Sequence, residues 1–243
     1  MNEQRLTSIH IDQNLKLHFN MENLYNVNGL FFWTQEEIRL RRMFEDYFSS
    51  EILSSLKKQN SAFCMIQVEA PLLTPRELIN KGYDEKDIWA FDDVALRPET
   101  TMGSFAYAKH ILSTHNEIKQ KLPIIIFQHG KSFRREQEQP IKHMKLKEFY
   151  QLEFQIIFSS NTANDYSVKL YPDILNAFEK MIGTCRLEES DRLPDYSEQT
   201  TDVICLKSEM EVCSMSKRKD FEGYKVIEIA IGTDRCVFNF QNK

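Results

Sequence analysis

Two charged stretches decide the fold: Lys131-Ser132-Phe133-Arg134-Arg135-Glu136 and, after a polar loop, Lys145-Leu146-Lys147-Glu148-Phe149-Tyr150-Gln151-Leu152-Glu153. An apolar run, Pro123–Gln128, precedes the first stretch, and the second continues as an aromatic and β-branched run to Phe158. The pattern predicts two strands joined by a charged loop. Arg, Lys and His in this loop suit a polyphosphate, and the aromatic ring of Phe149 can stack on a base. A merely solvated charged hairpin is the alternative.

Helical and strand patterns surround this hairpin. Hydrophobic spacing predicts a helix over Thr34–Lys58, with Thr34 and Glu37 as a capping box, and then a strand from Phe63 to Val68 that leads to Pro71. Further expected elements are a short helix from Pro75 to Asn80, helices Thr100–Leu112 and Tyr166–Ile182, strands Asp202–Leu206, Met210–Met215 and Tyr224–Ile231, and a closing helix Asp234–Phe240. This order predicts an α+β fold whose sheet is mainly antiparallel and flanked by helices. We expect residues 1–28 to be a leader and residues 29–243 to form a single domain.

Composition excludes several classes of protein. The chain has 243 residues, 42% of them hydrophobic, and 31 Lys+Arg against 36 Asp+Glu give a net charge of −5. Wholesale disorder and a general nucleic-acid coat are therefore unexpected. No run approaches the roughly 18 apolar residues of a membrane span. The five cysteines are odd in number, widely spaced and without a C-x-x-C pair, which fits a reducing compartment, the cytoplasm.

A second chemical segment is Leu96-Arg97-Pro98-Glu99-Thr100. Arg97 and Glu99 flank a proline that favours an extended approach to a helix, for which Thr100 is the expected cap. By itself this segment also fits an ordinary strand-to-helix turn with surface charges.

Two more segments lie near the C-terminus. In Glu211-Val212-Cys213-Ser214 an acid and a hydroxyl form a hard-oxygen set suited to Mg²⁺, although a regular strand would need a twist or bulge to bring Ser214 to the face of Glu211. In Val226–Arg235 an acid, Glu228, interrupts an apolar strand that ends at a Gly and an early helical Arg. Such an acid needs a cationic partner, and a structural pairing is the alternative to a catalytic role.

Taken in order, these segments resemble the catalytic core of class II aminoacyl-tRNA synthetases, and most of all glycyl-tRNA synthetases. Pro71 is similar to the dimer-interface proline of the family's first motif, and Leu96–Thr100 resembles the Arg-Pro-Glu-Thr stretch of glycyl enzymes. Phe133–Glu136 with Phe149 resembles the second motif, and Ile231-Gly232-Thr233-Asp234-Arg235 resembles the third. The resemblance runs from about Gly29 to Asn239.

The resemblance implies a binding site for ATP. Arg134 would bind the α-phosphate and the amino-acid carboxylate, and Glu136 would hydrogen-bond the adenine amino group. Phe149 would stack on adenine, with Arg235 on the opposite face and in contact with the γ-phosphate. Arg134 and Arg235 are therefore the expected catalytic residues, because positive charge aimed at developing oxyanions is the main tool for such a displacement.

The resemblance also implies sites for a metal ion and an amino acid. Glu211 and Ser214 resemble the acid and hydroxyl that hold Mg²⁺ in the seryl-type enzyme of the class. Glycyl enzymes use several acids to hold the substrate ammonium, and Glu99, Glu153 and Glu228 stand at the matching positions. The full set of amino-acid-binding residues implied in this way is Arg97, Glu99, Gln151, Glu153, Glu228 and Ala230.

Several positions depart from the glycyl pattern. Ile229 and Ala230 stand where that pattern has Pro and Ser, and Lys145-Leu146-Lys147 replaces an Arg-x-Arg. The chain ends at Lys243, soon after the third motif, and we expect it to lack an anticodon-binding domain.

The leading hypothesis is therefore activation of a small amino acid, glycine first, as an aminoacyl-adenylate, with transfer to an acceptor: a tRNA, a carrier protein or another nucleophile. The alternatives are a non-catalytic synthetase paralogue that acts as a regulatory or accessory subunit, and a part of a larger synthetase. The first motif predicts a homodimer formed through the Thr34–Lys58 helix.

Overall fold

The structure is a computed structural model that describes residues 26–27, 30–59, 64–79, 83–135, 144–191 and 193–243. Glu136 and nearly all of the expected leader lie outside these ranges. The described end of the leader is a short strand, β1 (Asn26–Val27), which pairs antiparallel with β2 (Leu30–Phe31).

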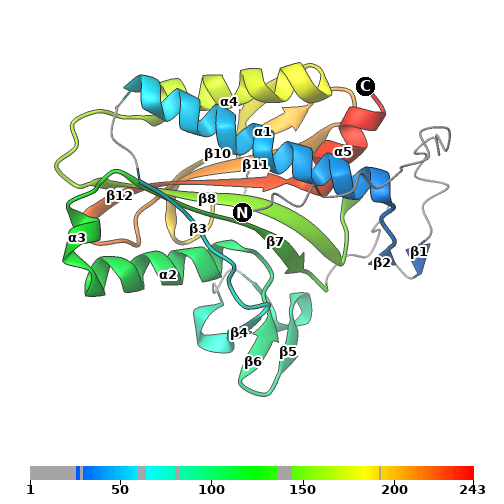
Figure 1. The fold of residues 1–243 in the computed structure, drawn as a ribbon. Coiled ribbons are helices and arrows are strands. Elements are labelled where there is room, and N and C mark those ends of the chain that lie inside the picture. Colours follow the sequence, from blue (N-terminus) through cyan, green and yellow to red (C-terminus); the bar gives the residue numbers. More distant parts are fainter. Residues whose placement is uncertain (1–25, 28–29, 60–63, 80–82, 136–143, 192) are drawn as a thin grey trace, which may run out of the picture.

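A large sheet forms the centre of the part of the chain that is described (Figure 1). Its seven strands, in spatial order, are β3 (Cys64–Gln67), β7 (Ile124–Phe133), β8 (Glu148–Ser159), β12 (Tyr224–Gly232), β11 (Met210–Arg218), β10 (Ser197–Cys205) and β9 (Cys185–Glu189). Only the β3–β7 pair is parallel among these neighbours. The predicted α+β fold with a mainly antiparallel sheet is confirmed.

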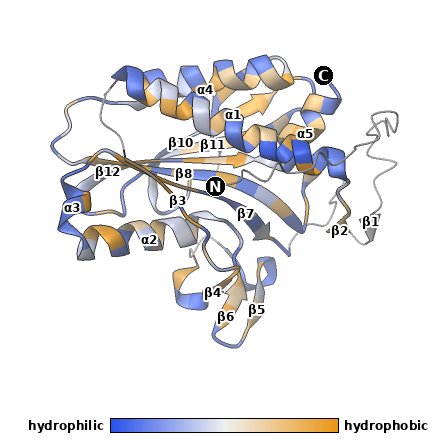
Figure 2. Cartoon of the chain, in the orientation of Figure 1, coloured by the Kyte–Doolittle hydropathy of each residue, from blue (hydrophilic) through white to orange (hydrophobic). Residues whose placement is uncertain are grey.

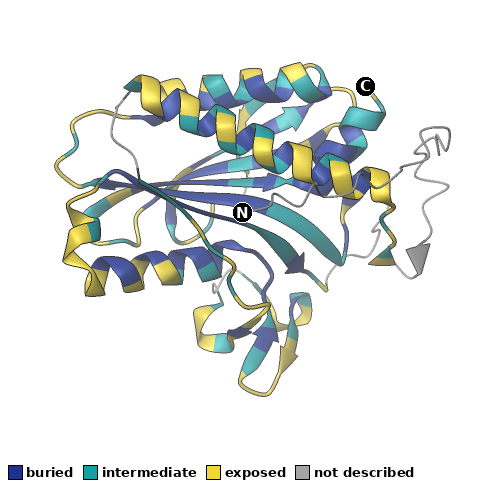
Figure 3. Ribbon diagram, in the orientation of Figure 1, coloured by how far each residue is buried: buried dark blue, intermediate teal, exposed yellow. Residues whose placement is uncertain are grey.

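Three helices cover one face of this sheet: α1 (Gln35–Gln59), α4 (Ser167–Ile182) and α5 (Thr233–Gln241) (Figure 1). Their apolar sides face the strands and their polar sides face outward (Figures 2 and 3). Phe44, Phe48 and Phe178 are fully buried between α1 and α4. One half of the expected capping box is present, since the Thr34 amide donates to the Glu37 carboxylate at 2.7 Å. The Thr34 hydroxyl bonds the same carboxylate.

The opposite face carries α2 (Thr101–Thr114), followed by the short helix α3 (Asn116–Lys119). Beside α2 lies a small antiparallel sheet that the sequence did not predict. Its strands, in spatial order, are β4 (Leu73–Pro75), β6 (Val94–Leu96) and β5 (Trp89–Phe91). Each of its strands has three residues, which is too few to show the two-residue alternation of a β-strand.

Two local predictions in this region are wrong. The expected helix from Pro75 to Asn80 is only a 3-10 turn over Arg76–Leu78, because Pro75 is held in β4 by its pairing with Val94. Thr100 does not cap α2: its own backbone is helical, with φ −71° and ψ −27°, and its side chain makes no capping hydrogen bond. A cap residue must stand outside the helical conformation for its oxygen to reach the first amides.

Strand alternation gives the large sheet two faces, one beneath α1, α4 and α5 and the other beneath α2. On β8, Leu152, Phe154 and Ile156 enter the core beneath the three helices. Between them, Glu153 and Gln155 are just as buried but point toward α2, where Glu153 hydrogen-bonds the Ser104 hydroxyl. The face under α2 is mixed, because Ile157 and Val226 pack there in a second apolar cluster with residues of α2. The polar part of this face holds the candidate site.

Candidate active site

Arg134 stands at the end of β7, where the chain leaves the sheet. Its amide donates to the Lys147 carbonyl at 2.9 Å, which keeps the two hairpin strands together at this point. Its guanidinium lies 5.3 Å from the centre of the Phe149 ring and 5.6 Å from that of Tyr83. Its Nη2 also donates to the Tyr83 hydroxyl at 3.1 Å. The hairpin thus presents a planar cation beside an aromatic ring, and the roles expected for Arg134 and Phe149 toward ATP stay predictions.

Arg235 brings a second cation to this end of the site from the first turn of α5. Its Nη1 donates to the Glu211 carbonyl at 2.6 Å and lies 4.0 Å from the Glu211 carboxylate. Burial lowers the pKa of Arg235, Glu211 raises it, and the nearby charge of Arg134 lowers it further. Two guanidinium groups that repel each other in this way are suited to an anion placed between them.

The expected acid–hydroxyl pair on β11 is brought together by a β-bulge. Val203 pairs with Cys213 but the next residue, Ile204, pairs with Glu211, so β11 has one extra residue at this point. The bulge supplies the irregularity that the pair needs, and Glu211 and Ser214 both act on one carboxylate, that of Asp202. Sequence reasoning missed a third member, Asp202, which pairs with Ser214 across the strands.

Asp202 is the structural observation that bears on a metal ion. Its carboxylate is buried and its Oδ1 has no hydrogen-bond partner. Burial, and then the charge of Glu211, raises the pKa of Asp202 to about 6. Among the described residues no group of three or more His, Cys, Asp and Glu side chains could hold a metal ion by itself. Two carboxylates and a hydroxyl nevertheless fit Mg²⁺, which usually shares its ligands between one or two protein carboxylates and substrate phosphates.

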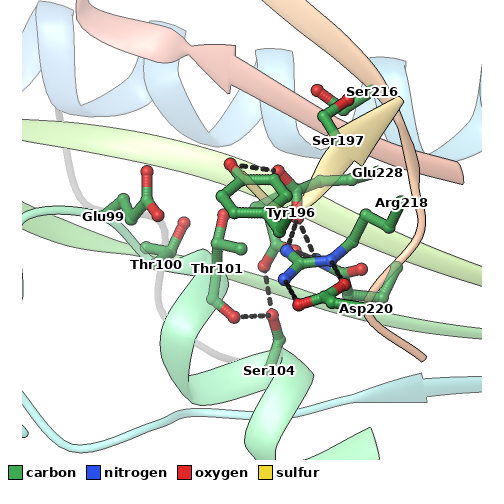
Figure 4. Close-up of polar contacts among 12 residues, drawn as sticks. Glu99, Thr100, Thr101, Ser104, Tyr196, Ser197, Ser216, Arg218, Asp220 and Glu228 are labelled. Carbon is green, nitrogen blue, oxygen red and sulfur yellow. Dashed lines mark hydrogen bonds and ion pairs between the residues drawn. The ribbon is translucent and has the colours of Figure 1, made fainter. Parts of the chain in front are cut away.

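A group of buried carboxylates lies deeper under α2. It consists of Glu99 before α2 and Glu228 on β12, which are labelled in Figure 4, and of Glu153 on β8. The Gln155 amide links two of them, because its Nε2 donates to Glu153 at 2.5 Å and to Glu228 at 2.7 Å. The sequence predicted that these three acids converge, and the structure brings them together.

These carboxylates differ in charge. Burial, and then the charge of Glu228, raises the pKa of Glu153 to about 8, so that Glu153 holds a proton at neutral pH. The same two causes, in the same order, raise the pKa of Glu99, while Arg134 opposes them. Glu228 differs from both, because it is in direct contact with a cation.

Arg218 on β11 is that cation. Its Nη1 bonds Glu228, and its Nε and Nη2 hold both oxygens of Asp220, at 2.9 and 2.7 Å (Figure 4). The guanidinium is sandwiched between the rings of Phe105 at 3.7 Å and Tyr196 at 3.9 Å. Sequence reasoning assigned Arg218 no role, and the only available signal was an Arg-x-Asp pair at the end of a strand. The buried acid therefore has a structural cation, as the alternative interpretation of Glu228 required.

Arg97 and Gln151 form a frame beneath the acids. Arg97 is buried and donates to the carbonyls of Lys131 at 2.8 Å and Ala70 at 2.7 Å. It packs so closely on Gly130 that a Cβ there would lie 2.3 Å from its guanidinium. Gln151 accepts from the Ser132 hydroxyl at 2.6 Å and from the Thr100 amide at 3.3 Å. Contact of either residue with an amino acid stays a prediction, as it does for Ala230, which stands half-buried on β12.

The chain is similar in sequence to two kinds of tRNA ligase. The chain is 28% identical to glycine–tRNA ligase of Mycoplasma capricolum over 165 residues. It is also 28% identical to histidine–tRNA ligase of Rickettsia bellii, over 145 residues. These alignments cover 65% and 55% of this chain and 34% and 33% of the two ligases. The chain is a relative of the class II aminoacyl-tRNA synthetases. The matched stretch spans about one third of the length of each of these two ligases.

Structural comparison supports the fold of this synthetase relative. The crystal structure of prolyl-tRNA synthetase from Cryptosporidium parvum, complexed with halofuginone and AMPPNP, superimposes with a TM-score of 0.68. The match covers 89% of this chain and 48% of that one, at 13% sequence identity. No protein-family model matches the chain. Within the described residues, no helix is both long enough and apolar enough to cross a membrane.

Proposed function

We propose that this chain joins ATP to a small amino acid, with glycine as the first candidate, to give an aminoacyl-adenylate and pyrophosphate. The observation that carries the proposal is a short chain of contacts through Tyr83. The Tyr83 hydroxyl accepts from Arg134 at 3.1 Å and donates to Glu99 at 2.9 Å. It therefore joins the cation that would meet the α-phosphate to a carboxylate that would meet the amino acid's ammonium. The two reactants would be held side by side.

The charged residues have separate tasks in this proposal. Arg134 would bridge the α-phosphate and the amino-acid carboxylate, and would stabilise the negative charge that grows as the carboxylate attacks phosphorus. Phe149 and Arg235 would enclose the adenine between a ring and a planar cation. Asp202, Glu211 and Ser214 would hold Mg²⁺, which neutralises phosphate charge when bound.

The proposed amino acid is small because the deep end of the site is already filled. Phe105, Tyr196 and Arg218 form a packed stack there, and Arg218 neutralises Glu228. Glu153 is neutral at pH 7, and Glu99 is the acid that Tyr83 links to Arg134. The balance of charge then suits a single ammonium group. The relatives named for glycine favour glycine, and those named for histidine make histidine the second amino acid to test.

ATP–pyrophosphate exchange measured with each amino acid in turn tests the proposal. We expect exchange with glycine, loss of at least about a hundredfold in Arg134→Met, and little change in Arg42→Met, which alters an exposed arginine on α1. Absence of exchange with every amino acid would overturn the proposed activity. Calorimetric titration of ATP–Mg²⁺ would then separate a non-catalytic paralogue that lost ATP binding from one that kept it.

We propose that the aminoacyl group of the adenylate is then transferred to an acceptor. The relatives named as tRNA ligases favour a tRNA, and a carrier-protein thiol is the second candidate. Incubation of the chain with ATP, labelled glycine and either bulk tRNA or a carrier protein distinguishes them by which acceptor retains label. Label in neither would overturn both. Free thiols at all five cysteines fit our proposal of a reducing compartment, the cytoplasm.

We also propose that the chain forms a homodimer through α1 and the segment that follows β3. This side of the molecule exposes large apolar side chains: Leu72, Leu73 and Leu78 are each exposed by more than two-fifths. A cavity of about 230 Å³ lies beside them, between this segment and α2. Exposed apolar surface of this kind is typical of association sites. A 28.8 kDa monomer in sedimentation at micromolar concentration would count against the dimer.

A further inference from the structure

A half-buried histidine links two helices on the face of the sheet opposite the acids. The imidazole of His129, on β7, lies between α1 and α5 and uses both of its nitrogens. Its Nδ1 is 2.9 Å from the Glu45 carboxylate on α1, and its Nε2 is 3.0 Å from the Thr233 hydroxyl, which is the first residue of α5. Three elements far apart in sequence therefore meet at one ring.

Both partners of the imidazole are themselves fixed. The second oxygen of Glu45 accepts from the Gln67 amide of β3 at 3.2 Å. The Thr233 hydroxyl is also 3.2 Å from the Tyr150 carbonyl of β8. A side chain held from two directions loses little further freedom when a third contact forms, so this chain of hydrogen bonds can transmit position.

The bridge serves the start of α5, where Arg235 lies two residues after Thr233. Asp234, which lies between Thr233 and Arg235, is buried. Its carboxylate accepts from the Tyr150 amide at 2.9 Å and lies 3.6 Å from the Arg41 guanidinium of α1. The first turn of α5 is thus attached to β7, β8 and α1. It carries Arg235, whose guanidinium donates to the Glu211 carbonyl of β11.

The hydrogen bonds can be satisfied in both charge states of the ring. Burial, and then the charge of Arg41, lowers the pKa of His129, and Glu45 opposes this. In the neutral ring, Nδ1–H donates to Glu45 and the Thr233 hydroxyl donates to Nε2. In the charged ring, Nε2–H donates to Thr233, whose hydroxyl hydrogen turns to the Tyr150 carbonyl. The link between α1 and α5 therefore survives protonation.

We propose that His129 is a positioning residue that fixes Arg235 through Thr233, with Glu45 as the group that orients the ring. This rests on the proposed function, in which Arg235 contacts ATP. It adds that ATP affinity depends on a link to α1, the helix through which we propose that the dimer forms. The imidazole itself touches no substrate.

Two matched substitutions test this role. Thr233→Val keeps the shape of the side chain and removes its hydroxyl, whereas Thr233→Ser keeps the hydroxyl and removes a methyl group. Calorimetric titration with AMPPNP and Mg²⁺ measures affinity without turnover. We expect Thr233→Val and His129→Leu to weaken binding about five- to tenfold, as the loss of one or two buried hydrogen bonds implies. We expect Thr233→Ser and the exposed control His110→Leu to bind within about twofold of the unchanged chain.

Exchange kinetics separate positioning from general damage. We expect the KM for ATP to rise in Thr233→Val and the KM for the amino acid to stay unchanged, since Arg235 contacts Glu211 and Glu99 is linked to Arg134 through Tyr83. The inference would be overturned if both KM values rose equally in Thr233→Val or if its AMPPNP affinity did not change. It would also be overturned if Thr233→Val and Thr233→Ser lost AMPPNP affinity to the same extent. If His129→Leu does not fold, the Thr233 pair decides. An unchanged chain that binds AMPPNP but supports no exchange would refute the proposed activity alone, and one that does not bind it would refute both.

Discussion

Replacing Glu153 with Gln should make the protein more stable at neutral and alkaline pH. The carboxyl is fully buried, and its pKa of about 8 means that it is protonated in the folded protein at pH 7. In that state it can donate to the Ser104 hydroxyl, which donates onward to the Thr101 carbonyl at 3.2 Å, while its other oxygen accepts from Gln155. A Gln amide can make the same donor and acceptor contacts.

The size of the effect follows from linkage between protonation and folding. The folded pKa is raised, so the stabilising contribution of protonated Glu153 is complete below its ordinary pKa of 4.5 and is lost as the pH rises to about 8. Over that range the wild-type free energy of unfolding falls by about 1.4 kcal/mol per pH unit because of this group. Glu153→Gln lacks this loss. The difference between variant and wild type should therefore grow by about 3 kcal/mol between pH 5 and pH 7.

Urea unfolding of both proteins at pH 5, 6, 7 and 8, followed by circular dichroism, measures this difference. Glu198→Gln is the matched control, because Glu198 is an exposed residue of β10. Parallel stability curves for wild type and Glu153→Gln across the whole range would show that the carboxyl is ionised when folded. The assignment of charge within the acid group would then be wrong.

Two further predictions concern packing. Gly130→Ala should lower the free energy of unfolding by about 1–3 kcal/mol, because its new methyl group would meet the Arg97 guanidinium at 2.3 Å. Gly232→Ala should lower it less, because the closest contact of its methyl group would be 3.6 Å. Equal urea midpoints for the two variants would contradict this prediction. Alkylation by iodoacetamide, followed by mass spectrometry, should label half-buried Cys64 first and leave the four buried cysteines unlabelled until urea unfolds the chain. Burial raises the pKa of Cys185 to about 12, so its early labelling would refute this order.

The sequence by itself determined those features that depend on local pattern. Apolar runs predicted β8 and β12 as strands and marked Glu228 as an acid within an apolar strand. The grouping of Glu99, Glu153 and Glu228 was expected only from the resemblance to glycyl-tRNA synthetases. The Gly before Arg235 marked the start of α5, and Thr34 with Glu37 marked that of α1.

Only the tertiary structure decided which side chains are partners across the fold. Arg218 neutralises Glu228, Asp202 joins Glu211, and His129 reaches Glu45, each across a distance in sequence that no local pattern records. The small sheet β4–β6–β5 was missed for the same reason, since strands of three residues are stabilised by their neighbours and not by their own sequence. Local pattern reflects which face a residue buries, whereas charge and hydrogen bonding at the site depend on contacts that exist only once the strands are assembled.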